Sequence, residues 1–343
     1  MKGLVKFKVG GDGMELRDLP EPTVGEGDLK VKVKAAGICG SDVHFMRDEL
    51  SSVVMPVVLG HEYVGVVAEV GHGVTKFKPG DWVTSMTTYK ACGKCFYCQQ
   101  GLIMFCDKRK ALGITMNGAM ADYLLTSEAN SFLVPDEIEN KLAVAACEPF
   151  GCGARAAAER AGIKLGDVVV VSGPGALGLS VVQIAKLQGA YVIAYGLPKD
   201  KSRLQLAIEL GADDMAIDEN ELKQKVYAKN PYGADVCFEV AGAEASMDLC
   251  IRITRKRGTL AQVGLFPGKA YIDMNMILDK ELTVSNNFGS HRSTWELCLR
   301  LLAEKKVSLD RFTDAQFPLS EWRQAFETAA SGTRFKVLLL PGA

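Results

Sequence analysis

Cys39, His61 and Glu62 offer the three side-chain types that can hold a reactive zinc ion. The segment GICGSDVH carries the thiol of Cys39, and GHEYVGVVAEVG supplies the adjacent imidazole and carboxylate. Such ligands bind zinc with one coordination position left for water or a substrate. Gly60, beside His61, permits an unusual backbone where ligands converge. The sequence therefore predicts an open, catalytic metal site at these residues.

Glu148 lies in ACEPFGCG, near the middle of the chain. Its carboxylate could serve as a fourth ligand or could hold a metal-bound water. Cys147 and Cys152 are rival ligands, and we interpret both as buried thiols. We assign no ligand role to His72.

Ser41 and His44 follow Cys39 closely and could carry a proton away from the site. Zinc lowers the pKa of a bound alcohol, so the released proton needs a route from a dry site to solvent. A hydroxyl beside the ligand and an imidazole further out would form that route. The alternative for Ser41 is a helix N-cap, which is compatible with a proton role.

Four cysteines follow the pattern C-x2-C-x2-C-x7-C, namely Cys92, Cys95, Cys98 and Cys106. Four thiolates so close together suit a closed zinc site that braces a loop. An iron–sulfur cluster is the main rival, but the bacterial ferredoxin run has three residues before its last cysteine and a proline after it. A zinc-ribbon nucleic-acid module is a second rival, and the formal net charge of −1 argues against it.

A glycine-rich segment, SGPGALG, follows the apolar run VVVV and places Gly173, Gly175 and Gly178 in the pattern G-x-G-x-x-G. After a strand and before a helix, this pattern indicates a dinucleotide site, because backbone N–H groups can approach a pyrophosphate there. The alternative is a turn whose glycines serve packing only. We assign the cofactor to Gly173, Gly175, Ala176, Leu177, Gly178, Gly196, Lys199, Lys201, Arg203, Val263 and Gly264.

The end of the next strand, YVIAYGLPKDKSRL, has Gly196 where an NAD-preferring site usually places an acid. Without that carboxylate a 2′-phosphate is not repelled, and Lys199, Lys201 and Arg203 could pair with it. We therefore favour NADP(H) over NAD(H). The alternative is a solvated basic loop at a helix start, with Asp200 serving the ribose.

The elements that would position these residues divide the chain in two. Residues 1–150 contain short apolar or alternating segments between Gly, Pro and Asp clusters, which predicts a β-rich domain. From residue 151 to 289, strands alternate with helices, which predicts a doubly wound parallel sheet and an α/β fold. Residues 290–343 would complete the first domain with a final strand, FKVLLLP. Six parallel strands are expected near residues 168, 191, 215, 234, 259 and 282.

Composition narrows the class of protein. The chain has 343 residues, of which 48% are hydrophobic and 24% charged, as in a soluble globular protein of two domains. Near-zero net charge gives no reason to expect a nucleic-acid partner. No apolar run approaches the roughly 20 residues that span a bilayer, and the N-terminus lacks a secretory signal. Ten cysteines then indicate metal ligands and buried thiols, and we expect a cytoplasmic location.

The chain resembles the zinc-dependent medium-chain dehydrogenases, and most closely their sorbitol (polyol) dehydrogenase branch. The motifs that carry the resemblance are GICGSDVH, GHEYVGVVAEVG, the cysteine segment, EPFGCG, GPGALG and FGSHRSTWEL. The resemblance covers essentially the whole chain. It implies a GroES-like catalytic domain joined to a Rossmann domain, assembled as a homodimer or homotetramer.

The resemblance also implies roles for individual residues. Cys39, His61 and Glu62 match the catalytic zinc ligands, and Glu148 matches a carboxylate that binds zinc directly or through water. Ser41 and His44 match the positions through which the proton of the alcohol leaves, while its hydride passes to nicotinamide.

Three positions depart from the family pattern. Phe45 replaces a common tyrosine, and Gly196 replaces the usual acid. The segment FGSHRSTW is one residue longer than usual, so a substrate-facing arginine does not carry over directly to His291 or Arg292.

We expect an NAD(P)-linked, zinc-dependent oxidoreductase that interconverts a secondary alcohol, such as a polyol or sugar alcohol, and its ketone. It would hold two zinc ions per chain. The alternative enzyme is a threonine-type or amino-alcohol dehydrogenase, which uses similar ligands. A non-catalytic scaffold that binds zinc and nucleotide is a different class of hypothesis, and it would need none of the catalytic residues. The expected partners are a small-molecule alcohol or ketone, with no nucleic acid and no membrane.

Overall fold

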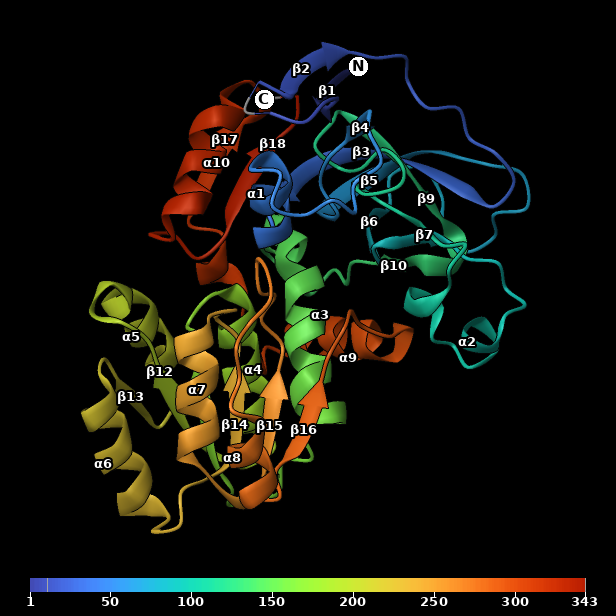
Figure 1. Ribbon diagram of the computed structural model, residues 1–343. Coiled ribbons are helices and arrows are strands. Elements are labelled where there is room, and N and C mark those ends of the chain that lie inside the picture. The colour runs from blue at the N-terminus through green and yellow to red at the C-terminus, as the bar shows by residue number, and fades with distance from the viewer. Residues whose placement is uncertain (11, 343) are drawn as a thin grey trace. The chain divides into compact units, whose positions relative to one another are not determined.

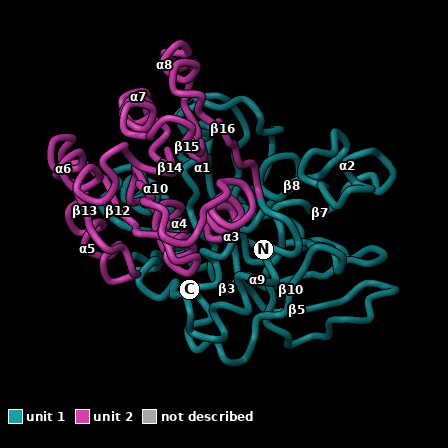
Figure 2. The backbone as a smooth tube through the Cα atoms, turned by 90° about the horizontal axis from the view of Figure 1, so that it is seen from below, with its two compact units in different colours: residues 1–148, 290–343 teal, residues 149–289 magenta. Residues whose placement is uncertain are grey.

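The structure, a computed structural model, describes residues 1–10 and 12–342. The chain divides into two compact units (Figures 1 and 2). Unit 1 consists of residues 1–148 and 290–343, and unit 2 consists of residues 149–289.

Unit 1 is built on a seven-stranded sheet with the order β10-β6-β5-β3-β18-β17, in which β9 also pairs with β3. The longest strands, β3 and β5, are antiparallel, and apolar side chains of β3 such as Val31 and Val33 are fully buried. The strands are β3 (Asp28–Gly37), β5 (Glu62–Val70), β6 (Trp82–Ser85), β9 (Tyr123–Ser127), β10 (Ser131–Leu133), β17 (Ala315–Pro318) and β18 (Val337–Leu340).

Two smaller sheets and several helices complete unit 1. One sheet has the order β2-β1-β4 and the other pairs β7 with β8. Their strands are β1 (Lys2–Lys6), β2 (Met14–Asp18), β4 (Val57–Val58), β7 (Thr88–Lys90) and β8 (Lys110–Ala111). The α-helices are α1 (Gly40–Met46), α2 (Phe96–Gln99), α9 (Arg292–Ala303) and α10 (Trp322–Ser331), and α3 (Cys147–Arg155) begins at the end of residues 1–148. Short 3-10 helices lie at Ile103–Phe105, Glu128–Asn130, Lys141–Ala146, Asp310–Phe312 and Leu319–Glu321.

Unit 2 contains a parallel six-stranded sheet with the order β13-β12-β11-β14-β15-β16. Its strands are β11 (Val168–Ser172), β12 (Tyr191–Tyr195), β13 (Asp214–Ala216), β14 (Ala234–Glu239), β15 (Thr254–Gln262) and β16 (Thr283–Asn286). The strands pair in parallel throughout, which confirms the predicted doubly wound sheet. Because both faces are covered, β11 is buried along its whole length.

Helices cover both faces of this sheet. Helices α4 (Ala176–Leu187) and α5 (Lys201–Glu209) pack on one face. On the other face lie α6 (Glu219–Lys229), α7 (Glu244–Ile253) and α8 (Met274–Asp279), as Figure 2 shows. A π-helix at Ala156–Arg160 and a 3-10 helix at Pro198–Asp200 are the irregular helical segments.

Residues 1–10 and 12–342 contain no helix that combines the length and the apolar character needed to cross a membrane.

Candidate metal and cofactor sites

The pairing of β3 with β5 brings the predicted zinc ligands together. Gly37, the last residue of β3, lies opposite Glu62, the first residue of β5. Cys39 follows β3 and His61 precedes β5, so both lie at the same edge of the sheet. One donor atom each from Cys39, His61 and Glu62 lies within 4.8 Å of the others.

The carboxylate of Asp42 lies between Cys39 and His61. The carboxylate of Asp42 is fully buried, and its Oδ2 accepts a hydrogen bond from the backbone N–H of Cys39 at 2.9 Å. Oδ1 lies 3.9 Å from Nδ1 of His61, and neither atom has a hydrogen-bond partner among residues 1–10 and 12–342. Burial opposes protonation of His61, but Asp42 and Cys39 outweigh burial and raise its pKa. A carboxylate in this position can orient an imidazole that binds a metal.

The start of α1 contradicts the alternative that Ser41 is a helix N-cap. The N-cap of α1 is Cys39, and Ser41 lies inside the helix. The alternative that Ser41 is the N-cap is therefore wrong. The reason is that the helix starts directly after β3, where the Asp42 side chain accepts a hydrogen bond from the backbone N–H of Cys39.

Two glycines leave room for the ligands. Gly60 has φ +92°, and a Cβ there would lie 2.8 Å from Cγ of Met120. A Cβ on Gly37 would lie 2.3 Å from Oε2 of Glu62. A larger residue at Gly37 would displace the Glu62 carboxylate, and one at Gly60 would be strained and would clash with Met120 beside His61.

Lys336, immediately before β18, is the counter-charge of Glu62. Both side chains are buried, and Nζ of Lys336 lies 2.8 Å from Oε1 and 2.7 Å from Oε2 of Glu62. Nζ also donates to the carbonyl oxygen of Ile38 at 3.1 Å. Burial disfavours the charged amine, but Glu62 and Cys39 outweigh burial and raise the pKa of Lys336. One ammonium group thus connects the segment that carries Cys39 to the residue beside His61.

Glu148 lies near this cluster but is not one of its three converging donors. Its Oε1 accepts a hydrogen bond from Oγ1 of Thr87 at 3.1 Å. Burial raises the pKa of Glu148, and the nearby His61 opposes that rise. Burial also raises the pKa of Cys147 well above that of a free thiol, as expected for a thiol that binds no metal. The donor set of Cys39, His61 and Glu62 therefore fits zinc, with Glu148 held beside it.

Ser41 and His44 both lie on α1, which begins at Cys39. Each is partly exposed. Nδ1 of His44 lies 2.5 Å from Oε2 of Glu49, a contact that orients the imidazole. The arrangement is compatible with the predicted proton route, and the roles of both residues stay predictions.

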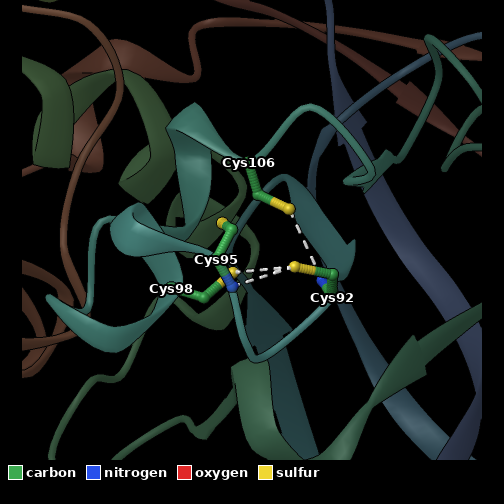
Figure 3. Close-up of side chains that lie close together, drawn as sticks. All are labelled: Cys92, Cys95, Cys98 and Cys106. Carbon is green, nitrogen blue, oxygen red and sulfur yellow. Dashed lines mark hydrogen bonds between the residues drawn. The ribbon is translucent and has the colours of Figure 1, made fainter.

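The four cysteines downstream converge around α2. Their side chains point toward one another (Figure 3), and their sulfur atoms lie within 4.8 Å of each other. Sγ of Cys92 lies 3.9 Å from Sγ of Cys98 and accepts a hydrogen bond from the backbone N–H of Cys95. Backbone hydrogen bonds from Lys94 and Cys95 lower the pKa of Cys92 to about 6, whereas desolvation and the neighbouring thiols raise the pKa of Cys98 to about 12. Four sulfur donors fit a closed zinc site, because no position is left for a substrate.

The glycine-rich turn of unit 2 joins β11 to α4. Gly173 has φ +113°, and Gly175 is the N-cap of α4. A Cβ on Gly178 would lie 1.9 Å from the carbonyl oxygen of Gly173, so the helix packs directly on the turn. Ala176 and Leu177 form the first turn of α4, whose backbone N–H groups have no acceptor within the helix. This geometry suits a pyrophosphate.

The turn after β12 carries the residues considered for NADP. Gly196 is buried, whereas Lys199 and Lys201 are exposed. Asp200 is buried, and its carboxylate accepts from the backbone N–H of Leu197 at 3.1 Å and lies 3.5 Å from Arg203. The carboxylate of Asp200 thus stabilises its own turn, which weakens the alternative that it serves a ribose. Val263 and Gly264 follow β15.

Sequence reasoning missed Lys336, Asp42, Thr87 and Glu49. A lysine immediately before the wholly apolar strand VLLL was the one available signal, because a buried amine needs an anionic partner. The partners of the other three follow only from contacts in the fold.

Comparisons with known proteins show the family of the chain. Residues 25–136 match the alcohol dehydrogenase GroES-like domain, and residues 176–304 match the zinc-binding dehydrogenase family. The sorbitol dehydrogenase of Halalkalibacterium halodurans is 40% identical over 99% of both chains. The D-arabitol-phosphate dehydrogenase of Enterococcus avium is 37% identical over 99% of this chain and 97% of that protein. A zinc-binding dehydrogenase from Sinorhizobium meliloti 1021, solved with NADP bound, is 31% identical with a TM-score of 0.88 over 99% of both chains.

Replacing Lys336 by Met is expected to destabilise the metal-free protein, because the buried Glu62 carboxylate loses its partner. Breaking a buried pair costs roughly 3 kcal/mol or more. The loss should be smaller with zinc present, since the metal also compensates Glu62. Chemical unfolding with and without a chelator measures both values.

Lys2→Met provides the control, because the Lys2–Asp18 pair is exposed and such pairs contribute at most about 1 kcal/mol. Equal losses of stability for the two variants would show that Lys336 does not compensate Glu62.

Proposed function

The chain belongs to the zinc-binding dehydrogenase family, and from this premise we propose that it interconverts a secondary alcohol of a polyol or sugar alcohol and the corresponding ketone. The cofactor is a nicotinamide dinucleotide, and NADP is favoured over NAD. The observation that carries the proposal is the convergence of a thiol, an imidazole and a carboxylate within 4.8 Å. A structural or scaffold protein would not need such an open donor set.

The substrate class is supported by the relatives. Two enzymes named for polyol substrates, sorbitol and D-arabitol phosphate, are 40% and 37% identical to the chain. Unit 1 carries the candidate metal site and unit 2 carries the glycine-rich turn. We therefore propose that unit 1 is the catalytic domain and unit 2 the cofactor-binding domain.

The chain's own residues account for the movement of the proton. Cys39, His61 and Glu62 would hold zinc, which would supply a Lewis acid for an alcohol or carbonyl oxygen. Oxidation of the alcohol would release a hydride, for which the nicotinamide would be the acceptor, and the proton of the hydroxyl group. Ser41 passes this proton to His44, and the partly exposed imidazole releases it to solvent.

Several residues hold this arrangement in place. Lys336 fixes the Glu62 carboxylate, and Asp42 faces the imidazole of His61. Glu49 orients the His44 ring. Glu148 stays beside the metal ligands, either as a further ligand or as the acceptor for a water, with Thr87 as its hydrogen-bond donor.

Assembly and location belong to the proposal as well. We propose a homodimer or homotetramer, which the family resemblance implies. A cytoplasmic location is supported by the cysteines, since none of the ten forms a disulfide bond.

Cys39→Ser is expected to remove turnover while leaving cofactor binding intact, because a serine hydroxyl is a poor zinc ligand. Turnover should fall by more than about 100-fold, which is the largest loss expected for a residue that only hydrogen-bonds to a metal ligand. Elemental analysis should give two zinc ions per chain in the wild type and one in the variant. Retained turnover would remove Cys39 from the site.

A substrate panel tests the proposed class directly. The purified protein is incubated with sorbitol, arabitol, D-arabitol phosphate or L-threonine and with NADP or NAD, and reduced nicotinamide is followed by absorbance. Turnover of one or more polyols is expected, with Cys39→Ser as the blank. Turnover of threonine alone would replace the proposed substrate class with the amino-alcohol alternative.

Replacing Lys199, Lys201 and Arg203 together by alanine is expected to weaken NADPH binding about tenfold and NADH binding less, because only the former carries a 2′-phosphate. Dissociation constants from fluorescence titration measure both effects. Lys223→Ala, at a half-exposed position of α6 where the lysine pairs with Glu219, is the control. Equal losses for the two cofactors would assign the three residues to a solvated loop.

A further inference from the structure

Glu239, the last residue of β14, lies between two other strand ends. In the strand register it is opposite Ser172 at the end of β11 and Gln262 at the end of β15. The strand order reverses between β11 and β14. In open α/β sheets, ligands bind outside the carboxyl ends of the strands at such a reversal. Glu239 therefore lies where the dinucleotide is expected, although no sequence motif marks it.

The carboxyl group of Glu239 holds the turn that follows β14. Its Oε1 accepts hydrogen bonds from the backbone N–H groups of Ala241 and Gly242, both at 2.9 Å. The side chain is fully buried, and Oε2 has no hydrogen-bond partner within the described parts of the chain. Burial raises the pKa of Glu239, and the nearby Ser246 hydroxyl and the backbone N–H groups of the turn oppose this rise. Burying such a group is costly, which indicates a specific use.

The backbone of Glu239 holds the turn that follows β15. Its carbonyl oxygen accepts from the N–H groups of Val263 at 2.9 Å and Gly264 at 3.0 Å. A Cβ on Gly264 would lie 2.4 Å from the nitrogen of Gly242 and 2.6 Å from Oε2 of Glu239. The two turns are therefore in direct contact around this carboxyl group.

The glycine-rich turn after β11 joins the same cluster. A Cβ on Gly173 would lie 2.8 Å from the backbone nitrogen of Ala241. The N–H of Val240 donates to the carbonyl oxygen of Ser172 at 2.9 Å. Because no side chain separates the turns, a shift of Ala241 reaches Gly173 directly, and a shift of Gly242 reaches Gly264.

We propose that Glu239 is a positioning residue for the dinucleotide: its carboxyl group fixes the turn at Ala241 and Gly242 and thereby sets the spacing between Gly173 and Gly264. Glu239 acts through these turns and does not contact the cofactor. The inference rests on the proposed function, because it needs a nicotinamide dinucleotide at this edge of the sheet.

Asp235 provides a matched control on the same strand. It lies near the amino end of β14, and its carboxylate also accepts a backbone hydrogen bond, from Val168 at 2.8 Å, and pairs with Arg255 at 2.5 Å. Its loss should lower stability without reaching the three turns at the opposite edge.

The experiment compares Glu239→Ala, Glu239→Gln and Asp235→Ala in the full-length, zinc-loaded protein. Fluorescence titration with NADPH and NADH gives dissociation constants, and denaturant unfolding gives midpoints. Glu239→Ala should raise both dissociation constants about tenfold, a change of about 1.4 kcal/mol. Glu239→Gln should stay within about threefold of the wild type, since the amide oxygen accepts the same two hydrogen bonds. Asp235→Ala should lower the midpoint and leave both dissociation constants unchanged.

An unchanged dissociation constant in Glu239→Ala, together with a lowered midpoint as in Asp235→Ala, would give Glu239 a purely structural role and overturn the inference. If Glu239→Ala does not fold, Glu239→Asp replaces it, because the shorter side chain withdraws the carboxylate from the turn. An unchanged dissociation constant in that variant has the same meaning. A wild-type protein that binds neither NADPH nor NADH would instead refute the proposed function, and this inference with it.

Discussion

The antiparallel pairing of β3 with β5 is the constraint on which the candidate zinc site depends. It places Gly37 opposite Glu62, so that Cys39 and His61 meet at one edge although they are distant in sequence. A shift of one residue in this register would turn the Glu62 side chain to the opposite face of the sheet. The absence of a side chain at residue 37 is part of the same constraint, because a Cβ there would overlap the carboxylate.

The buried acidic groups at this edge of the sheet favour binding of a cation. Asp42 and Glu62 are fully buried, with Glu148 and the thiol of Cys39 close by, whereas Lys336 is the buried ammonium that faces them. Uncompensated buried charge is unfavourable, and the raised pKa values of Asp42 and Glu148 reflect that cost of burial. A divalent metal ion would compensate the negative charge that the single ammonium group of Lys336 leaves unpaired. The fold itself holds these donors close together.

The sequence predicted what depends on local patterns and missed what depends on long-range contacts. The six strands of unit 2 and the family are confirmed, because apolar strands between helices and the glycine and cysteine motifs are visible along the chain. The N-cap alternative for Ser41 was wrong, since Cys39 begins the helix. Lys336 gave almost no signal because the fold of the sheet brings it to Glu62, which is distant in sequence. Glu239 gave almost none because the sheet, and not a sequence motif, places its turn beside Gly173 and Gly264. The domain limits and the roles of the site residues stay predictions.

The two units position their predicted site residues by different interactions. In unit 1, the predicted metal ligands are side chains, and their orientation depends on buried ion pairs such as Lys336–Glu62. In unit 2, the turns at the proposed cofactor site meet backbone to backbone, and glycine at residues 173 and 264 is required by contacts under 3 Å. The spacing between these turns cannot be changed in small steps by replacing the glycines, because any side chain there would push the turns apart. The spacing of the turns must therefore be set by a neighbouring group that bonds to a turn without lying between the turns. The carboxyl group of Glu239, at the end of β14, is such a group.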